Sequence, residues 1–397
     1  MSLCSRGWSS WWMVALVAIG FAGCDASVPK EKEKSTASST AKPAETTSPG
    51  SPETKSTTPA ATTDAPGSVK RIVILTNGDS PYWDACREGL NAANSELKLN
   101  DSGLKAVLDV NDGTPQGQLS KLQQYGTQSD IAGIGVSAID ANNVAVADEL
   151  RSLQKKGIKV LTIDSDLDRE KFRDARFAFI GTDNLTGGKV LGTCAKGLRE
   201  DGGEYVTFVG RTGAQNAIER IDGFAEGAGD KFVAKDKMAD DTNKAVAREN
   251  VRNAIRNHAG LNTLVGIWSY NAPAIVDVVR ELDRRKDFTV VVFDAEPDAI
   301  TSMKDGQIDA MVVQNPFDMG YQGVRLIKAL VQDQKDVIAE MLPNHGQPDG
   351  DIFDTGLKVV VPSEDSPLKA DQFDKNVQFL TLPVFQEWLT KYGLTGS

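Results

Sequence analysis

Carboxylate, amide and aromatic side chains gather directly after several short apolar runs of this chain. Carboxylates and amides exchange paired hydrogen bonds with neighbouring hydroxyl groups, and aromatic rings cover the apolar C–H faces of a sugar. The pattern therefore predicts a binding site for a polyhydroxylated molecule. The clusters are Asn77 to Trp83, Asp164 to Asp166, Thr182 to Asn184, Tyr270 with Asn271, Asp294, and Gln314 with Asn315.

The chain offers little for catalysis. His258 and His345 are its only histidines, and neither has a Cys, Asp or Glu at the spacing of a metal or triad partner. Asp164 and Asp294 could form the carboxylate pair of a surface glycoside hydrolase, but we expect Arg220 to keep both ionised, whereas a general acid needs a raised pKa. The sequence therefore predicts a protein that is not an enzyme, with no cofactor and no metal site.

Short β-branched runs alternate with longer amphipathic stretches from residue 70 onward. Arg71 to Thr76 is an expected strand, and Pro81 to Leu97 an expected helix with Pro in its first turn. Such alternation predicts an α/β fold of parallel sheets with helices on both faces, which bind ligands beyond the carboxyl ends of the strands. Further strands are expected at 107–110, 131–136, 159–163, 177–180, 205–209, 264–268, 289–293 and 310–313, and further helices at 114–125, 188–198, 218–228, 245–257, 272–282 and 320–331.

Seven short motifs follow one another along residues 71–361: Pro81-Tyr82-Trp83, Val160 to Asp164, Phe179 to Asn184 with Gly187-Gly188, Glu219-Arg220 with Gly223-Phe224, Tyr270-Asn271, Val291 to Asp294, and Val313 to Pro316. In this order they resemble the landmarks of periplasmic sugar-binding proteins of the ribose/galactose type. The resemblance implies the type I periplasmic binding protein fold: two Rossmann-like lobes with parallel sheets, joined by a hinge of three chain crossings.

The resemblance also implies roles for five polar residues. Asp164 and Arg220 would grip ligand hydroxyls, while Asn271 and Asp294 would complete the polar ring from the second lobe. Gln314 would sit beside a hinge crossing.

Three aromatic residues complete the ligand-binding set that the resemblance implies. Tyr82 and Trp83 would stack on one sugar face, and Trp268 on the other; a place in the core is the alternative for either Trp. Many ribose-type members have Arg directly after the matching Asp, whereas Ser165 follows Asp164 here. A bidentate donor is missing at that position, so the identity of the sugar does not carry over.

Some of these polar residues have structural alternatives. Asp183 and Asn184 stand where a helix begins, and we expect turn or cap roles for them rather than ligand contacts. Arg220 could pair with Glu219 or Asp222 on a solvated helix face instead of facing a ligand.

The resemblance divides the folded part into two lobes. The expected N-terminal lobe comprises residues 70–182 plus 315–355, and the C-terminal lobe residues 183–314 plus 357–397, with crossings near Thr182-Asp183, Gln314-Asn315 and Gly356. Asp371 to Gly393, with Phe385 and Trp388 at helical spacing, predicts one extra helix near the C-terminus.

The N-terminal segment has the pattern of a secretion signal. Arg6 precedes an apolar stretch from Trp11 to Phe21, which is too short to span a bilayer of roughly 30 Å as a helix. The run Phe21-Ala22-Gly23-Cys24 resembles a bacterial lipobox, in which the Cys thiol is acylated and the preceding peptide removed. We therefore expect a signal peptide over residues 1–23 and a lipid anchor on Cys24; plain secretion with an incidental Cys is the alternative.

Residues 24–69 are rich in Ser, Thr, Ala, Pro, Lys and Glu and contain no aromatic residue. Such a segment cannot bury enough apolar surface to offset its ordering entropy, so we expect a disordered linker. The net charge of −11, without a basic run, excludes a typical nucleic-acid binder. Cys86 and Cys194 are expected to be two separate buried thiols, although an exported protein could pair them.

Together these features predict a membrane-tethered, monomeric solute-binding protein that presents a monosaccharide or similar polyol to an ABC permease and its ATPase. We expect it in the periplasm, and Asp25 after the lipidated position favours the inner membrane. The alternative is a ligand sensor that feeds a chemoreceptor or histidine kinase, which would bind its ligand in the same way.

Overall fold

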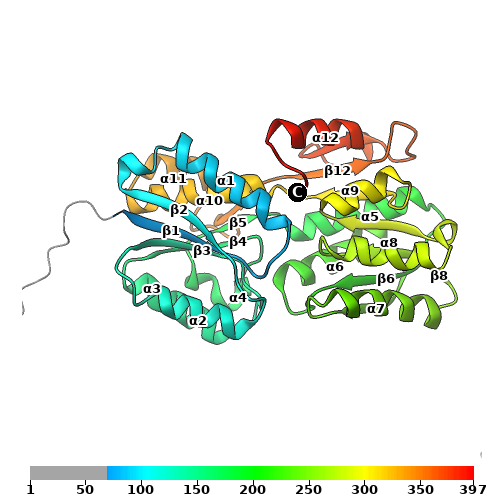
Figure 1. The fold of residues 1–397 in the computed structure, drawn as a ribbon, viewed down its shortest axis with the longest axis horizontal. Helices are drawn as coiled ribbons and strands as arrows, with labels where there is room; N and C mark the ends of the chain where they lie inside the picture. The colour runs from blue at the N-terminus through cyan, green and yellow to red at the C-terminus, as the bar shows by residue number, and fades with distance from the viewer. Residues whose placement is uncertain (1–68) are drawn as a thin grey trace, which may run out of the picture. The chain divides into compact units, whose positions relative to one another are not determined.

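The computed structural model describes residues 69–397, which contain two β-sheets (Figure 1). The expected signal peptide, Cys24 and nearly all of the expected linker lie outside the described residues. The first sheet has the strand order β11-β5-β4-β3-β1-β2 and the second β13-β12-β10-β9-β8-β6-β7. Among the pairings of these strands, only that of β10 with β12 is antiparallel. The predicted α/β fold with two parallel-dominated sheets is therefore confirmed.

Both sheets are built from short strands, and the central ones are buried on both faces. The first sheet contains β1 (Lys70–Leu75), β2 (Leu104–Asp109), β3 (Ile131–Val136), β4 (Lys159–Ile163), β5 (Phe179–Gly181) and β11 (Ile352–Asp354). The second contains β6 (Gly203–Val209), β7 (Phe232–Ala239), β8 (Leu261–Gly266), β9 (Thr289–Phe293), β10 (Ala310–Val313), β12 (Leu357–Val361) and β13 (Val377–Thr381).

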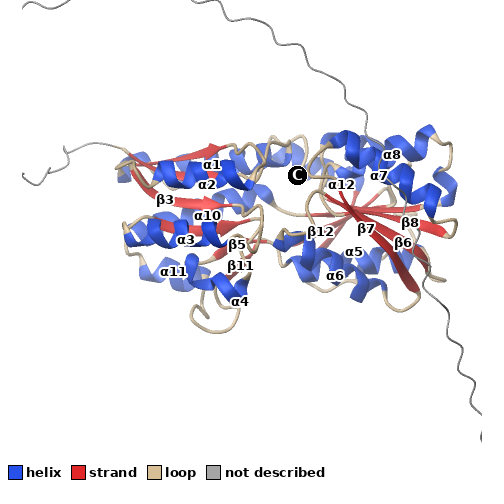
Figure 2. Ribbon diagram, turned by 90° about the horizontal axis from the view of Figure 1, so that it is seen from below, coloured by secondary structure: helices blue, strands red, loops and turns tan. Residues whose placement is uncertain are grey.

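Helices cover both faces of each sheet (Figures 1 and 2). The first sheet packs against α1 (Tyr82–Glu96), α2 (Pro115–Tyr125), α3 (Val144–Lys155), α4 (Arg169–Phe172), α10 (Pro316–Val331) and α11 (Lys335–Met341). The second packs against α5 (Asn184–Leu198), α6 (Gln215–Ala228), α7 (Lys244–Asn257), α8 (Asn271–Glu281), α9 (Pro297–Lys304) and α12 (Leu382–Lys391). We call each sheet with its helices the first lobe and the second lobe. Four short 3₁₀ helices lie at Asn100–Ser102, Arg173–Ala175, Arg285–Asp287 and Ala370–Gln372.

Local sequence explains where the helices begin. Thr114 caps α2 by accepting a hydrogen bond from the backbone N of Gly117, and Pro115 occupies the first turn. Asn243 caps α7 in the same way. Each capped helix starts a few residues after a strand, so the intervening turn stays at the carboxyl edge of its sheet.

Helices α5 and α6 approach each other through glycines on both sides. A Cβ at Gly223 would lie 2.2 Å from the carbonyl oxygen of Leu185, and one at Gly192 would lie 2.3 Å from that of Phe224. Gly188 and Gly227 have equally close backbone neighbours on the opposite helix. The spacing of this helix pair is therefore set by direct backbone contact, and α6 is the helix that carries Arg220.

The prediction of a single helix over Asp371 to Gly393 is wrong. The segment forms a 3₁₀ turn, then strand β13, and only then helix α12 from Leu382. Pro383 lacks a backbone N–H and fits only the first turn of a helix, so it marks a start rather than an interior position.

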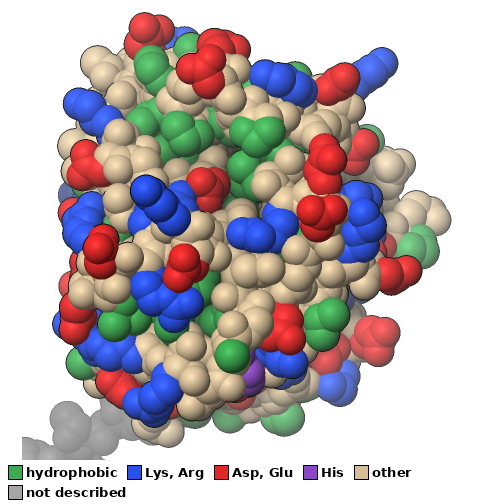
Figure 3. Space-filling model, turned by 90° about the vertical axis from the view of Figure 1, so that its right-hand side faces the viewer, with side chains coloured by type: hydrophobic (Ala, Val, Ile, Leu, Met, Phe, Trp, Pro, Cys, Tyr) green, Lys and Arg blue, Asp and Glu red, His purple; other side chains and the backbone are tan. Residues whose placement is uncertain are grey.

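Cys86 and Cys194 are free and buried, in α1 and α5, which confirms the prediction of two separate thiols. Burial raises the pKa of both thiols. Within residues 69–397, no helix combines the length and apolar character that a membrane crossing needs. On the face drawn in Figure 3, acidic and basic side chains are interspersed rather than gathered by sign.

Candidate ligand-binding cleft

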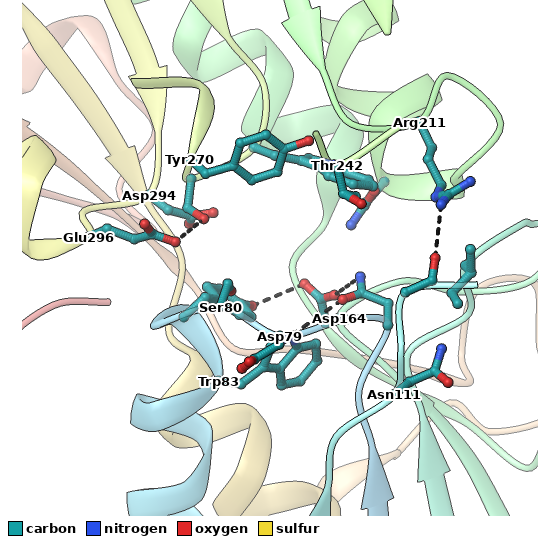
Figure 4. A pocket seen from close by; sticks show the side chains of 18 of the residues that line it. Asp79, Ser80, Trp83, Asn111, Asp164, Arg211, Thr242, Tyr270, Asp294 and Glu296 are labelled. Carbon is teal, nitrogen blue, oxygen red and sulfur yellow. Dashed lines mark hydrogen bonds between the residues drawn. The ribbon is translucent and has the colours of Figure 1, made fainter. Parts of the chain in front are cut away.

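A pocket of about 300 Å³ is lined by loops from both lobes (Figure 4). The loops follow the carboxyl ends of strands, as expected for parallel sheets. Seven of the eight expected ligand contacts line it: Tyr82, Trp83, Asp164, Arg220, Trp268, Asp294 and Gln314. The structure thus brings together residues that are distant in the sequence, and their ligand contacts remain a prediction.

Asp164 is the first residue after β4 and lies in the left-handed region, with φ of 62°. Its carboxylate accepts hydrogen bonds from Ser137 Oγ at 2.8 Å and from the Tyr82 hydroxyl at 3.0 Å. Asn77 Nδ2 lies 3.5 Å away. Burial raises the pKa of Asp164, while Arg220 and the two hydroxyl donors act in the opposite direction.

Asp294 is the first residue after β9 and has nearly the same backbone conformation, with φ of 63°. Gln314 Nε2 donates to both carboxylate oxygens at 3.1 Å, and the Gln314 backbone N donates to Oδ1 at 3.3 Å. Burial raises the pKa of Asp294 to about 6, against the opposing effects of Arg220 and Gln314. Arg220 thus does not fully offset the effect of burial, and the pKa values of Asp164 and Asp294 both lie above the ordinary value for Asp.

Arg220 is 1% exposed and points from α6 toward the two carboxylates. Its Nη1 lies 4.0 Å from Asp294 Oδ2 and donates to the carbonyl of Ile267 at 3.1 Å, and its Nε donates to Asn184 Oδ1 at 2.9 Å. The guanidinium carbon stands 4.2 Å from the centre of the Phe293 ring. Its Nη2 is buried without a hydrogen-bond partner among residues 69–397, so a donor remains for a ligand.

The residues beside Arg220 have other roles. Glu219 pairs with Arg169 at 3.2 Å, so the alternative of a solvated pair between Arg220 and Glu219 is wrong. Asp183 caps α5 by accepting from the backbone N of Thr186, which is the cap role expected for it. The Asn184 side chain neither caps the helix nor lines the pocket, but accepts from Arg220 Nε.

The aromatic side chains form walls of the pocket. Trp83 Nε1 donates to Asn77 Oδ1 at 3.3 Å, and its ring stands edge-on to Tyr82 with centroids 5.2 Å apart. Trp268 Nε1 donates to Asn216 Oδ1 at 3.2 Å. Each indole has its polar edge satisfied, which fixes the orientation of its ring.

Asn271 is the one expected contact that does not line the pocket. Its Nδ2 donates to Asp240 Oδ2 at 3.0 Å and its Oδ1 accepts from the backbone N of Trp268 at 3.1 Å. Because both ends of the amide are engaged, Asn271 orients the Trp268 loop. Ser165 also stands outside the lining and is fully buried.

Sequence reasoning missed several lining residues: Asn111, Asp112, Arg211, Asn216, Thr242, Lys244 and Glu296. Asn111 follows β2 and Arg211 follows β6, so the rule that found Asp164 would also have found these two. Figure 4 shows Arg211 and Asn111 at the end of the pocket opposite Asp294 and Glu296.

Two hydrogen bonds and one ion pair among residues 69–397 join the two lobes beside the pocket. All come from the segment between Arg211 and Glu219 of the second lobe. They are a hydrogen bond from Arg211 Nη2 to the Gly113 carbonyl at 2.8 Å, one from the Ala141 backbone N to the Gly213 carbonyl at 3.2 Å, and the ion pair of Arg169 with Glu219. Within residues 69–397, no group of three or more His, Cys, Asp or Glu residues could hold a metal ion.

Two parallel-dominated sheets with a polar and aromatic pocket at their carboxyl edges define an α/β protein of the two-lobed, cleft-binding class. The chain belongs to the periplasmic binding protein domain family, whose sequence pattern matches residues 71–335. The resemblance found in the sequence is thereby confirmed.

Curated relatives have low identity over most of their length. The ribose import binding protein of Salmonella typhimurium is 23% identical over 267 residues, which cover 66% of this chain and 85% of that protein. The D-allose-binding periplasmic protein of Escherichia coli is 23% identical over 273 residues, which cover 67% and 85%.

Solved structures agree in fold. An ABC transporter solute-binding protein from Burkholderia graminis, in complex with D-arabinose, has a TM-score of 0.64 at 25% identity, covering 75% of this chain and 96% of that one. A glucose-galactose binding protein from Geobacillus stearothermophilus also has a TM-score of 0.64, at 22% identity, covering 76% and 99%.

Proposed function

We propose that this protein binds a monosaccharide or similar polyol in the cleft and presents it to an ABC-type importer. The composition of the pocket lining is the observation that supports a sugar as the ligand. The lining combines several carboxylates, among them Asp164 and Asp294, with the Arg220 guanidinium, which has a free donor, and with two indole rings. Hydroxyl groups suit the polar groups, and the C–H faces of a sugar ring suit the indoles.

The size of the pocket favours a single sugar ring. Its volume of about 300 Å³ is at the lower end of the range for small-molecule sites. The importer as partner is inferred from relatives described as import or ABC transporter binding proteins. The crossings near Thr182, Gln314 and Gly356 are proposed as the hinge, because at each of them the chain passes from an element of one lobe to an element of the other.

The finer location is also a proposal. The family name implies the periplasm, and the Phe21-to-Cys24 run supports a lipid anchor on Cys24 that holds the protein at the inner membrane. We further propose that the protein has no enzymatic activity, because the relatives are described as binding proteins. Bound sugar should therefore be recovered intact after long incubation, and any product would count against this.

A thermal-shift screen followed by calorimetry tests the sugar proposal. The panel contains D-ribose, D-allose, D-arabinose, D-galactose and myo-inositol. A ligand at 100 times its Kd adds about 2.7 kcal/mol to the free energy of unfolding, so a true ligand should raise Tm clearly. The double variant Asp164→Asn, Asp294→Asn is the control and should not respond. A panel without any Tm shift or calorimetric binding would refute a site for this class of sugar.

A further inference from the structure

The C-terminal tail turns back toward the cleft after α12. Gly393 has φ of 66°, a conformation that favours glycine, and the backbone N of Leu394 donates to the carbonyl of Leu389 at 2.9 Å. This turn directs the last residues toward β9. Figures 1 and 2 both place the C-terminal end between the two lobes.

Ser397 joins the segment that carries Asp294. The Ala295 backbone N donates to the Ser397 carbonyl at 2.6 Å, and the Ser397 N donates to the Ala295 carbonyl at 3.0 Å. Ser397 Oγ donates to the Gln314 carbonyl at 3.1 Å. Ser397 is buried, with 2% of its surface exposed.

These hydrogen bonds lie on either side of the Asp294 carboxylate. Ala295 stands between Asp294 and Glu296, which both line the pocket, and Gln314 is the residue whose side chain holds the Asp294 carboxylate. The tail therefore contacts the backbone on both sides of the contact between Asp294 and Gln314. Asp294 stands in the left-handed region, which is less favoured for residues other than glycine, so contacts to the neighbouring backbone help to hold its conformation.

Gly396 allows the tail to reach this position. A Cβ there would lie 2.7 Å from the Ala295 carbonyl oxygen, 2.9 Å from Pro297 Cδ and 3.2 Å from Glu296 Cα. Two of these three neighbours are backbone atoms and the third is on a rigid ring, so a side chain on Gly396 has to displace the tail. The tail also lines a second cavity of about 190 Å³, together with the start of α1 and with Glu296 and Pro297.

We infer that residues 394–397 are a positioning element of the binding site, which holds Asp294 in the orientation that meets the ligand. The inference rests on the proposed function for the identity of the ligand. The new element is that residues 394–397, which do not line the pocket, influence the affinity for the ligand by holding the Asp294 carboxylate.

Hydrogen exchange tests the inference without a ligand. Gly396→Val in the purified, ligand-free protein should increase amide exchange at Ala295 and at Gln314, whose N–H groups bond to Ser397 and to Asp294. Glu387→Gln, on the exposed face of α12, is the matched control and should leave both amides unchanged. Unchanged exchange at Gln314 in folded Gly396→Val would overturn the inference.

A double-mutant cycle tests whether the tail acts through Asp294. The sugar for this test is the panel member that the wild type binds most tightly. Gly396→Val should raise its Kd on the order of tenfold, because the variant weakens one charge-assisted hydrogen bond without removing it. The same change should have little further effect in the Asp294→Asn background, yet keep its full effect in Asp164→Asn. Equal losses in both backgrounds would mean a merely structural role and would overturn the inference.

Serine variants keep the test informative if Gly396→Val does not fold. Ser397→Ala removes the hydroxyl bond to Gln314 and should weaken binding several-fold, whereas Ser397→Thr retains the hydroxyl and should bind as the wild type does. Equal affinity of Ser397→Ala and wild type would contradict the assignment. If no panel sugar binds the wild type, the proposed function fails, and the exchange at Gln314 still decides the positioning role.

Discussion

Asp164 and Asp294 occupy equivalent positions in the two lobes. The strand order β2-β1-β3-β4-β5 of the first sheet corresponds to β7-β6-β8-β9-β10 of the second, and each Asp directly follows the fourth strand of its series. Their φ angles are 62° and 63°. Arg220 lowers the pKa of both carboxylates, so Asp164 of the first lobe and Asp294 of the second share the influence of one guanidinium.

Removal of either carboxylate charge should weaken sugar binding strongly. Asp164→Asn and Asp294→Asn each lose a charge-assisted acceptor in a buried site, which corresponds to about 2 to 4 kcal/mol, or roughly 30- to 1000-fold in Kd. Calorimetry with the identified sugar measures this. Asp201→Asn, in an exposed turn, should bind as the wild type does. If both site variants bind the sugar with wild-type affinity, neither carboxylate contributes to sugar binding.

Sugar affinity should fall in mild acid. Asp294 has a pKa raised to about 6 by burial, and its ionised form is the stronger acceptor for a hydroxyl group. Below that pH, binding has to release a proton, so Kd should rise by up to about tenfold per pH unit. Titrations from pH 7 downward should show this for the wild type, and Asp294→Asn should lack the step near pH 6. An identical profile in both proteins would assign the step to another group.

The stability of the ligand-free protein should change with pH through the same residue. The pKa of Asp294 is about 6 in the folded protein and 3.8 ordinarily, so the folded state holds this proton more tightly. The contribution of Asp294 to the free energy of unfolding is then greatest below the pKa that Asp294 has in the unfolded chain. This contribution is lost as the pH rises through about 6. Between about pH 4 and pH 7, Asp294→Asn should gain Tm relative to the wild type. A constant Tm difference would show that Asp294 titrates normally.

The bond from Arg211 to the Gly113 carbonyl should slow sugar release. It joins the lobes beside the pocket, so Arg211→Ala should raise the dissociation rate on the order of tenfold while changing the association rate less. Stopped-flow fluorescence of Trp83 and Trp268 can measure both rates. Arg248→Ala, which removes an exposed Arg of α7, is the control. An unchanged dissociation rate would show that this contact has no role in retention.

Cys24→Ala should abolish lipid attachment. The thiol is the acceptor of the acyl chain in the lipobox pattern, and a protein with two or three chains is stably anchored where one with none is released. Mass spectrometry of the mature protein and membrane fractionation should show an acylated, membrane-bound wild type and an unacylated, detached variant. A wild-type mature protein without an acyl chain would contradict the anchor.

Strand-end reasoning predicted part of the site because β4 and β9 are continuous apolar runs, each followed by an Asp. It failed at β7, an edge strand whose residues are mostly exposed and which therefore lacks an apolar run. Thr242, beyond the end of β7, was missed for this reason.

The direction of a side chain was also beyond sequence reasoning. The Asn271 amide turns to Asp240, which lies at the end of the unrecognised strand β7. The pairing of Ser397 with Ala295 joins residues far apart in the sequence, and no local pattern indicates such a contact.

The glycine contacts between α5 and α6 have a consequence for protein engineering. Arg220 projects from the face of α6 that lies against α5, and even an alanine at Gly188 would bring its Cβ to 2.4 Å from the Arg220 carbonyl oxygen. A designer who wishes to retarget the cleft to another ligand can vary Trp83 and Trp268, because their indoles donate to Asn77 and Asn216 and not to either carboxylate. Gly188, Gly192, Gly223 and Gly227 have to stay, because a side chain at any of them would press on the backbone of the opposite helix and change the spacing of the pair that carries Arg220.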